Sequence, residues 1–500
     1  MTDVSSRIPV IVGVGQINDR PANPIEGLDS AQLMAAALLL ADQDAGGGWL
    51  ADADMLAIVD QMSFRELNPV GALVADAVGA TPRIIEQTEI PSGDSPTILL
   101  NEAANRIASG EVSVAAIVGG EALRTAAARA AAASGGERQN IVRAGASKRT
   151  GYRFDYGLAT PTDVYPLYEN GCRAAWGQSL DEAQRESGTI WSRFAEAAQE
   201  NPGAWIRKPV SAEEIIEPNA GNRRIAFPYN KLMVANSSVN QGAGFIVTSL
   251  AEARRRGVPE ERIVFVGLGA AAHEPEDPLA RDGYASTPAM AVSLNKALEL
   301  NQFKAAELDF VELYSCFPCV PKMARRVLDW PIDKPATVFG GLTFGGGPIG
   351  NYMSHAVVGM VQKLRSEGGK GLLFANGGYA THNHSIVLSS TPIAAAAFPQ
   401  DYHFQAEADA ARGPVPPLVP GYCGPGTIET YTVIYDRVGE PSFGVVVGRS
   451  PAGERFLAQV PASDEKTIAF LTNGQNEPVG TAGEAIAGDG GLVLWTSTGC

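Results

Sequence analysis

The 500-residue sequence contains only five cysteines, and their spacing repeats no pattern. An odd number of cysteines without a framework argues against a disulfide-stapled scaffold and is typical of a reducing compartment. The sequence also lacks an uncharged apolar run of about 18 residues, which argues against a transmembrane helix. Its first residues, MTDVSSRIPVIVGVGQ, lack the basic-then-apolar pattern of a signal peptide. We therefore expect a cytoplasmic protein that does not bind membranes.

Positive charge is also scarce. The chain has 39 Lys and Arg residues against 55 Asp and Glu residues, a net charge of −16. Its densest basic stretch, AEARRRGVPEERI, mixes the arginines with glutamates. Such a surface repels a phosphate backbone, so we expect no nucleic-acid partner. With 45% hydrophobic residues the chain can bury large cores, in about two to four structural units.

What the sequence does contain is an internal repeat. IPVIVGVGQ and ERIVFVGLG are both short β-branched apolar runs that end in glycine, as buried strands do. Each is followed by a helix-like segment and a second strand, MLAIVDQMSF in one half and LDFVELYSCF in the other. A further helix and a strand with Gly-Gly follow in both, VSVAAIVGGEAL and KGLLFANGGYAT. The alternation predicts two largely parallel sheets, covered by helices and related by a pseudo-twofold axis.

This symmetry predicts where a site would form. Equivalent strand ends and helix N-termini would converge near the axis, which would bring together the segment LYSCF and the turns at Gly93 to Pro96 and Gly345 to Gly350. An insertion at about 125–235 separates the halves. Its segment TPTDVYPLYENGCRAAW mixes turn signals with large apolar residues, so we predict a lid or loop domain rather than a third sheet.

The end of the chain differs in kind. The stretch GPVPPLVPGYCGP reads as a linker. TIETYTVIYDR, SFGVVVGR, RFLAQV, TIAFL and LVLW follow as short strands, and together they predict a small antiparallel β-barrel. The predicted boundaries are an N-terminal half at 1–260 with its loop domain at about 125–235, a C-terminal half at 261–410, a linker at 411–425 and a barrel at 426–500.

Four segments carry a resemblance to a known family: GVGQ, NEAANRIASGEVSVAAIVGGEAL, MVANSSVNQGAGFIV and GGLTFGGGPIG. Over residues 5–400 the sequence resembles the thiolase superfamily. Within it, the sequence is most similar to the sterol-carrier-protein type and to thiolase-like proteins type 1, which carry an additional C-terminal domain. The resemblance implies an α/β duplicated thiolase fold, with two βαβαβ halves and a loop insertion, followed by the barrel.

The resemblance also implies a chemistry. Thiolases are acyltransferases of lipid metabolism that handle 3-oxoacyl-CoA, so CoA or acyl-CoA is the expected partner, as a cosubstrate rather than a tightly bound cofactor. The barrel resembles the OB-like domain of small proteins that bind some thiolases. Residues 425–500 hold nine acidic and four basic residues, so we expect this barrel to pack on the thiolase body rather than on nucleic acid. Monomer and homodimer both remain open.

Most of the family's catalytic residues are replaced. Thiolases use a nucleophilic cysteine, an acid/base cysteine and a histidine. Ungapped matching places Gly93 at the nucleophile, Gly347 at the histidine of the Gly-His-Pro motif, and Asn376 near the late cysteine. Glycine has no side chain to acylate, so the resemblance implies that the usual nucleophile is missing.

One catalytic position is retained. The His-Asp-Cys-Phe signature of the sterol-carrier type matches Tyr-Ser-Cys-Phe at 314–317, which implies an acid/base role for Cys316. The helix predicted after it would favour a thiolate through its N-terminal dipole. The alternative is a small buried core residue. Cys319 is predicted to be core.

Two other readings of Cys316 and Cys319 are disfavoured. The Cys-Phe-Pro-Cys spacing resembles a thioredoxin motif, but no small βαβ domain surrounds it. A metal site would need His382 and His384 to complete it, and their context NGGYATHNHS reads as a loop, so we predict no metal site.

Further candidates come from the neighbouring segments. Tyr314 is a candidate proton donor, with packing as its alternative, and His382 is the best candidate general base. His355 is predicted to lie on a helix surface. Ser95, followed by Pro96, is predicted to cap a helix.

Backbone N–H groups at Gly346, Gly347 and Gly378 are expected to bind the CoA thioester. Three functions remain open: a thiolase-like acyltransferase, a non-catalytic acyl-CoA-binding protein, and a retro-aldol or hydrolytic lyase on the same fold.

Overall fold

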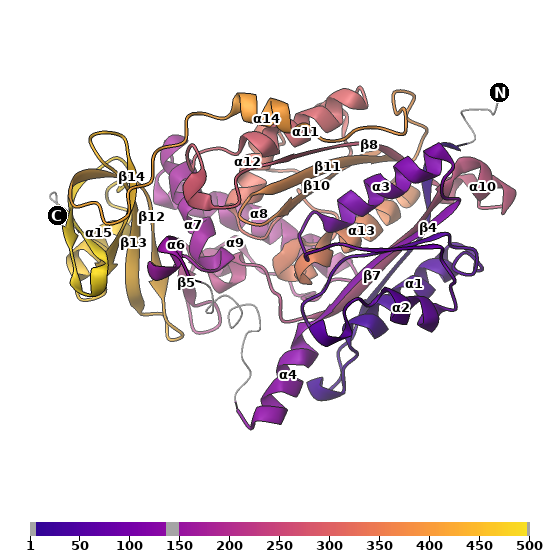
Figure 1. Ribbon diagram of the computed structural model, residues 1–500, viewed down its shortest axis with the longest axis horizontal. Coiled ribbons are helices and arrows are strands. Elements are labelled where there is room, and N and C mark those ends of the chain that lie inside the picture. The colour runs from indigo at the N-terminus through magenta and orange to yellow at the C-terminus, as the bar shows by residue number, and fades with distance from the viewer. Residues whose placement is uncertain (1–6, 137–149, 498–500) are drawn as a thin grey trace.

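The computed structural model describes residues 7–136 and 150–497, and its strands form two sheets within these ranges (Figure 1). The larger sheet belongs to the body of the protein. Its strands are β1 (Pro9–Asn18), β2 (Met55–Ile58), β3 (Ile84–Gln87), β4 (Val114–Ala122), β7 (Asn240–Ser249), β8 (Val264–His273), β9 (Phe310–Leu313), β10 (Lys370–Gly377) and β11 (His382–Ser389). No helix in the described ranges has both the length and the apolar character needed to cross a bilayer.

The order of these strands confirms the duplication. From the centre outward, β1, β7, β4 and β2 of the first half correspond to β8, β11, β10 and β9 of the second. The directions match as well. The first two pairings of each half are antiparallel and the third, β4–β2 or β10–β9, is parallel.

Two details of the predicted sheets are wrong. The sheets are mixed rather than largely parallel, because the last strand of each half inserts antiparallel beside the first. The halves also do not form separate sheets, because β1 pairs with β8 at Val10–Phe265 and Ile11–Val264. This pairing gives buried backbone groups at both central edges a partner.

Helices cover both faces of each half (Figure 1). In the middle, α3 (Ser95–Ser109) and α13 (Tyr352–Glu367) contact each other and strands of both halves. The outer face of the first half is covered by α1 (Ser30–Asp44) and α2 (Gly71–Val78). The second half is covered by α11 (Pro288–Leu300) and α12 (Cys319–Val327). The shorter helix α10 (Leu250–Arg255) contacts β1 and β7, and α14 (Gln405–Ala411) contacts α11 and β8.

The insertion is mainly helical where it is described. It contains α4 (Leu123–Ser134), α6 (Tyr152–Asp155), α7 (Pro161–Ala175), α8 (Leu180–Glu200) and α9 (Ala212–Ile216), and the strands β5 (Arg224–Ala226) and β6 (Tyr229–Asn230). The turn-rich segment TPTDVYPL is therefore the start of a helix, because Thr160 and Asp163 form a capping box around Pro161. The insertion also contributes to a sheet, since β5 extends the barrel at Ala226 and Ile434. Residues 137–149 of the insertion lie outside the described residues.

The C-terminal unit is a closed β-barrel at one end of the molecule (Figure 1). Its strands are β12 (Gly424–Tyr435), β13 (Pro441–Arg449), β14 (Arg455–Pro461), β15 (Ala482–Ala487) and β16 (Val493–Ser497). The barrel is not wholly antiparallel, because β14 and β16 pair in parallel. The predicted strand TIAFL belongs instead to helix α15 (Glu465–Thr472), whose N-cap Asp464 accepts a hydrogen bond from Thr467 N at 3.1 Å.

Buried polar contacts join the barrel to the body. The fully buried guanidinium of Arg455 pairs with Glu429 and also donates to the carbonyls of Leu279 (2.7 Å) and Arg281 (2.6 Å) in the body. Helix α7 supplies a second connection, because Asn170 Nδ2 donates to Tyr431 O at 2.9 Å. These carbonyls would lose their partners if the barrel moved away.

Replacing Arg455 tests this connection. We expect Arg455→Ala to lower the free energy of unfolding by about 3–5 kcal/mol, because it leaves the Glu429 carboxylate and two carbonyls without their buried partner. Arg449→Ala is the matched control, since Arg449 pairs with the same carboxylate at 2.8 Å but is partly exposed. Its cost should be about 0–1 kcal/mol. Urea unfolding curves measure both, and equal midpoints for the two variants would contradict the assignment.

Candidate functional site

A cavity of about 690 Å³ lies where both halves and the insertion meet. Its walls come from the segment before α3 (Pro91, Ser92, Gly93), the end of β9 (Tyr314, Cys316, Phe317), the turn before α13 (Gly347, Ile349), the end of β10 (Asn376, Gly377, Gly378) and the insertion (Thr160, Tyr165, Lys231, Ala235). The predicted convergence of these turns is confirmed. A second cavity of similar volume lies between α8 and α13, and none of the predicted site residues lines it.

Gly93 is packed too tightly to carry a side chain. A Cβ atom at this position would collide with the carbonyl oxygen of Asn376 and with the phenol of Tyr314. The loop is also held by its own contacts, since Ser92 N donates to Ser95 Oγ at 3.2 Å. Ser95 is therefore not the helix cap that we predicted, because Asp94 occupies the N-cap position. The phenol of Tyr314 lies where a side chain of residue 93 would have to go.

Tyr314 and Cys316 form the floor of the cavity. Both follow β9, and Tyr314 N continues the sheet by donating to Phe374 O at 3.1 Å. Tyr165 of α7 covers them, with its ring stacked on Phe317 at 4.5 Å between centroids. Its hydroxyl donates to Asn376 Oδ1 at 3.0 Å. This arrangement ties the insertion to the end of β10.

Burial keeps both groups of the floor protonated. It raises the pKa of the Cys316 thiol to about 12, and it raises the pKa of the Tyr314 phenol well above its ordinary value, with Cys316 and Asp94 adding to the rise. The expected help from a helix dipole does not outweigh burial, because α12 begins only at Cys319. At neutral pH the floor therefore offers proton donors and no thiolate.

Comparison with known proteins agrees with this architecture. A family profile described as "Thiolase-like protein type 1 additional C-terminal domain" matches residues 405–490. The crystal structure of a monomeric SCP2-thiolase like protein type 1 from Mycobacterium smegmatis is 30% identical, with a TM-score of 0.83, and the match covers 100% of both chains. The chain belongs to the SCP2-thiolase-like proteins of type 1.

More distant structures share the fold. The Ltp2-ChsH2(DUF35) aldolase is 19% identical with a TM-score of 0.59, over 77% of this chain and 99% of the other. Human mitochondrial 3-ketoacyl-CoA thiolase is 15% identical with a TM-score of 0.58, over 77% of this chain and 100% of the other. No match was found among curated protein sequences.

The three glycines predicted to bind the thioester differ in position in this type 1 thiolase-like protein. Gly347 and Gly378 line the cavity. The Gly347 N–H already donates to Asn236 O at 2.8 Å. Gly346 is not among the described residues that line the cavity, and its Cβ would collide with Gln241.

The histidines do not reach this cavity. His382 begins strand β11 rather than lying in a loop, and its Nε2 is 3.0 Å from Glu276 Oε1. The structure therefore does not bring His382 together with Tyr314 and Cys316. His384 is fully buried at 3.3 Å from Asn101 Oδ1, and burial lowers its pKa to about 3.

The sequence prediction for His355 is also wrong. It is not on a helix surface but fully buried, with Nδ1 2.9 Å from Gln16 Oε1. Burial lowers its pKa to about 3, so its ring is neutral at physiological pH. The cause is the position of α13, which is enclosed between the two halves.

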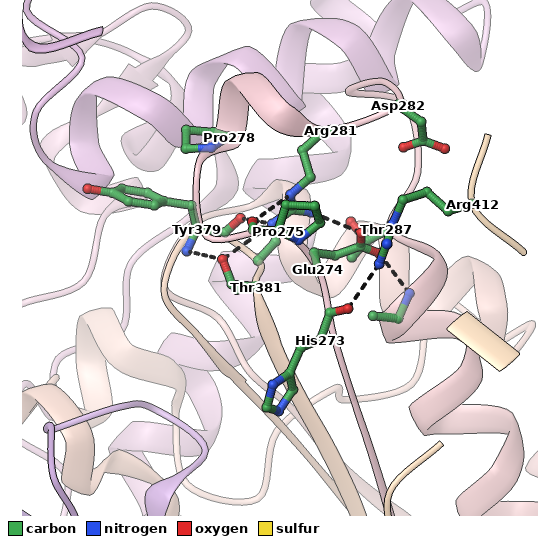
Figure 2. Close-up of polar contacts among 12 residues, drawn as sticks. His273, Glu274, Pro275, Pro278, Arg281, Asp282, Thr287, Tyr379, Thr381 and Arg412 are labelled. Carbon is green, nitrogen blue, oxygen red and sulfur yellow. Dashed lines mark hydrogen bonds and ion pairs between the residues drawn. The ribbon is translucent and has the colours of Figure 1, made fainter. Parts of the chain in front are cut away.

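A buried polar network behind the cavity was not predicted (Figure 2). Glu274 accepts from Ala289 N at 2.8 Å and pairs with Arg412 at 3.0 Å. Arg281 is also buried, and it donates to Tyr379 O at 2.8 Å. The network fixes the loop after Gly378, which lines the cavity. In the sequence, Glu274 and Arg281 lie in HEPEDPLARDGY, which is indistinguishable from an exposed turn.

The packing at Gly93 gives a first test of the site. We expect Gly93→Ala to destabilise the protein by about 1–3 kcal/mol, because the added methyl group must displace a backbone carbonyl and a buried phenol. Gly347→Ala is the control in the same cavity, since its nearest neighbour would lie at 3.3 Å. It should cost less than about 1 kcal/mol. Urea unfolding measures both variants, and a Gly93→Ala protein as stable as the control would contradict the close contact.

The protonation of Cys316 gives a second test. Of the four described cysteines, iodoacetamide should modify the exposed Cys423 first, whereas Cys316 should react slowly at pH 7. Since only the thiolate reacts, the Cys316 rate should rise about tenfold per pH unit up to its pKa near 12. Peptide mass spectrometry separates the two sites, with Cys316→Ser to assign the signal. A Cys316 rate that levels off below pH 9 would mean that the thiol has no raised pKa.

Proposed function

We propose that this thiolase-like protein binds CoA thioesters without forming an acyl-enzyme. The observation that carries the proposal is the packing at Gly93. Matching placed this residue at the nucleophile position, and the Tyr314 phenol and the Asn376 carbonyl fill the space beside it. A ligand can therefore be held above a floor of proton donors, with no side chain at residue 93 to acylate.

The cavity offers what such a ligand needs. Its volume of about 690 Å³ lies in the usual range for a ligand site, and Ile206, Leu232 and Phe317 provide apolar surface for an acyl chain. Lys231 is one of the lining residues, and its side chain is exposed. Its positive charge suits it to bind the phosphates of CoA. The phenol and thiol of the floor would donate to the thioester oxygen. Human mitochondrial 3-ketoacyl-CoA thiolase has been crystallised in complex with CoA, which supports the choice of ligand.

The geometry of the cavity gives less support to an acyltransferase. Thiolysis needs a thiolate to attack the substrate carbonyl, and the thiol of Cys316 has a pKa of about 12. No histidine lies on the cavity among the described residues. We therefore expect no thiolase activity at an ordinary rate.

A second candidate is a carbon–carbon lyase of the retro-aldol type. Tyr314 favours it, because a buried phenol that faces the cavity can donate the proton that the C2 carbon needs when the C2–C3 bond of a 3-hydroxyacyl thioester breaks. The 3-hydroxyl group becomes the carbonyl of the released product, and its proton returns to the phenolate through solvent. The distant fold match with the Ltp2-ChsH2(DUF35) aldolase adds to this candidate. We also propose that the chain is a monomer, as the Mycobacterium smegmatis protein is.

Titration calorimetry with octanoyl-CoA tests the proposal. We expect saturable binding to the wild type, and Ala235→Trp should abolish it by filling the cavity. Lys231→Ala should weaken binding about threefold to tenfold, because it removes one phosphate contact. Lys363→Ala is the control, since Lys363 lies on α13 outside this cavity. Binding that survives Ala235→Trp unchanged would contradict the site.

Activity assays on the same proteins separate the candidates. Acetoacetyl-CoA and CoA should give no thiolysis, and turnover at an ordinary thiolase rate would overturn the proposal. If a 3-hydroxyacyl-CoA is cleaved to a carbonyl compound and a shorter thioester, and Tyr314→Phe stops cleavage but keeps octanoyl-CoA binding, the lyase is correct. Binding without any turnover establishes the non-catalytic role.

A further inference from the structure

Four of the five histidines gather at one end of the second half. His273 ends β8 and His382 begins β11, and the two are direct partners in the register of these strands. Their ring centroids are 4.7 Å apart. Asp94, the N-cap of α3, reaches the same place from the first half. The pseudo-twofold arrangement thus brings two imidazoles and a carboxylate together from three elements.

The spacing of the three groups suits a metal ion. One ligand atom from each of Asp94, His273 and His382 lies within 4.8 Å of the other two. Two ligand atoms of one tetrahedral zinc ion lie about 3.4 Å apart, because each bond is about 2.0–2.2 Å long. Among the described residues, no comparable group contains Cys316, Cys319 or His384, the ligands considered from the sequence.

Asp94 provides independent evidence that something is missing from this arrangement. Its side chain is almost fully buried, yet Oδ2 has no hydrogen-bond partner among the described residues. Oδ1 accepts from Ser92 Oγ, and neither oxygen caps the N-terminus of α3, although Asp94 stands at the cap position. A buried carboxylate oxygen without a partner is costly, and a bound cation removes that cost.

The surroundings hold the two histidines in place. His273 is anchored through its backbone, since its N–H donates to Gln405 Oε1 at 2.8 Å. Its carbonyl also accepts from Arg412 at 3.0 Å (Figure 2). The Glu276 carboxylate holds the His382 ring. A carboxylate that contacts a ligand ring is typical of metal sites, where it orients the ring.

We propose that Asp94, His273 and His382 bind one divalent transition-metal ion of the zinc class. Two imidazoles and one carboxylate suit zinc, iron or cobalt, whereas magnesium and calcium prefer oxygen ligands. The ion would join α3 of the first half to β8 and β11 of the second. It would sit directly behind Gly377 and Gly378, whose missing side chains leave room beside Asp94 and His382. The inference does not depend on the proposed binding of thioesters.

Zinc binding to the tag-free, chelator-treated full chain tests the site. We expect one equivalent of Zn²⁺ by calorimetry, retained after dialysis and counted by elemental analysis, with a higher melting temperature for the loaded protein. Mg²⁺ should give no signal. Co²⁺ should give the visible absorption of an ion bound by nitrogen and oxygen ligands, which reports the ligands directly.

Matched variants decide whether the ion lies at this site. Asp94→Asn keeps the shape of the side chain, His382→Ala truncates a partly exposed ring, and each should weaken Zn²⁺ binding at least tenfold. His403→Ala is the control, because His403 is an exposed neighbour outside the three-ligand group. Circular dichroism checks that each variant folds. If one variant does not fold, the other still tests the site. Absence of stoichiometric Zn²⁺ binding by the wild type would overturn the proposal, as would unchanged binding by a folded Asp94→Asn or His382→Ala protein.

Discussion

The absence of a Cβ atom at residue 93 is the constraint on which the site depends. It allows the segment before α3 to close onto the end of β10, so that the Asn376 carbonyl and the Tyr314 phenol occupy space beside the glycine. The two halves of the body meet at this contact. Any side chain at residue 93 would push the halves apart or displace the phenol. Tyr314 and Cys316 are both largely buried, and this burial raises the pKa of each group so that both stay protonated.

The duplicated fold explains why one small region holds so much polar chemistry. Equivalent strand ends of both halves meet at the pseudo-twofold axis, with α3 and α13 between them. The Gly377–Gly378 turn lines the cavity and also lies beside Asp94 and His382. The barrel takes part as well, since Arg455 bonds the carbonyls of the segment that carries Arg281. A shift of the barrel would therefore reach the buried network behind the cavity.

Much of this architecture could be predicted from sequence, because buried strands and glycine turns have local signatures. The repeat of strand, helix and strand predicted the duplication, whereas the significance of Gly93 came from the resemblance to the thiolase family rather than from a local pattern. Other features depend on tertiary contacts that leave no local pattern. The apolar run TIAFL is equally compatible with a strand and a helix. It forms a helix because Asp464 caps that helix at its N-terminus. His355, Glu274 and Arg281 are buried because neighbouring elements of the fold enclose them, and no local sequence pattern records this. The meeting of His273, His382 and Asp94 required strand register and the contact between halves.

Intact-protein mass spectrometry after incubation with acetyl-CoA or acetoacetyl-CoA tests the central claim most directly. A protein that binds thioesters above Gly93, with Tyr314 and Cys316 protonated, should keep its unmodified mass throughout, while an ordinary thiolase treated in parallel should gain an acyl group. An acyl adduct that maps to Cys316, and that disappears when CoA is added, would contradict the account. It would show that the thiol of the floor acts as a nucleophile despite its burial.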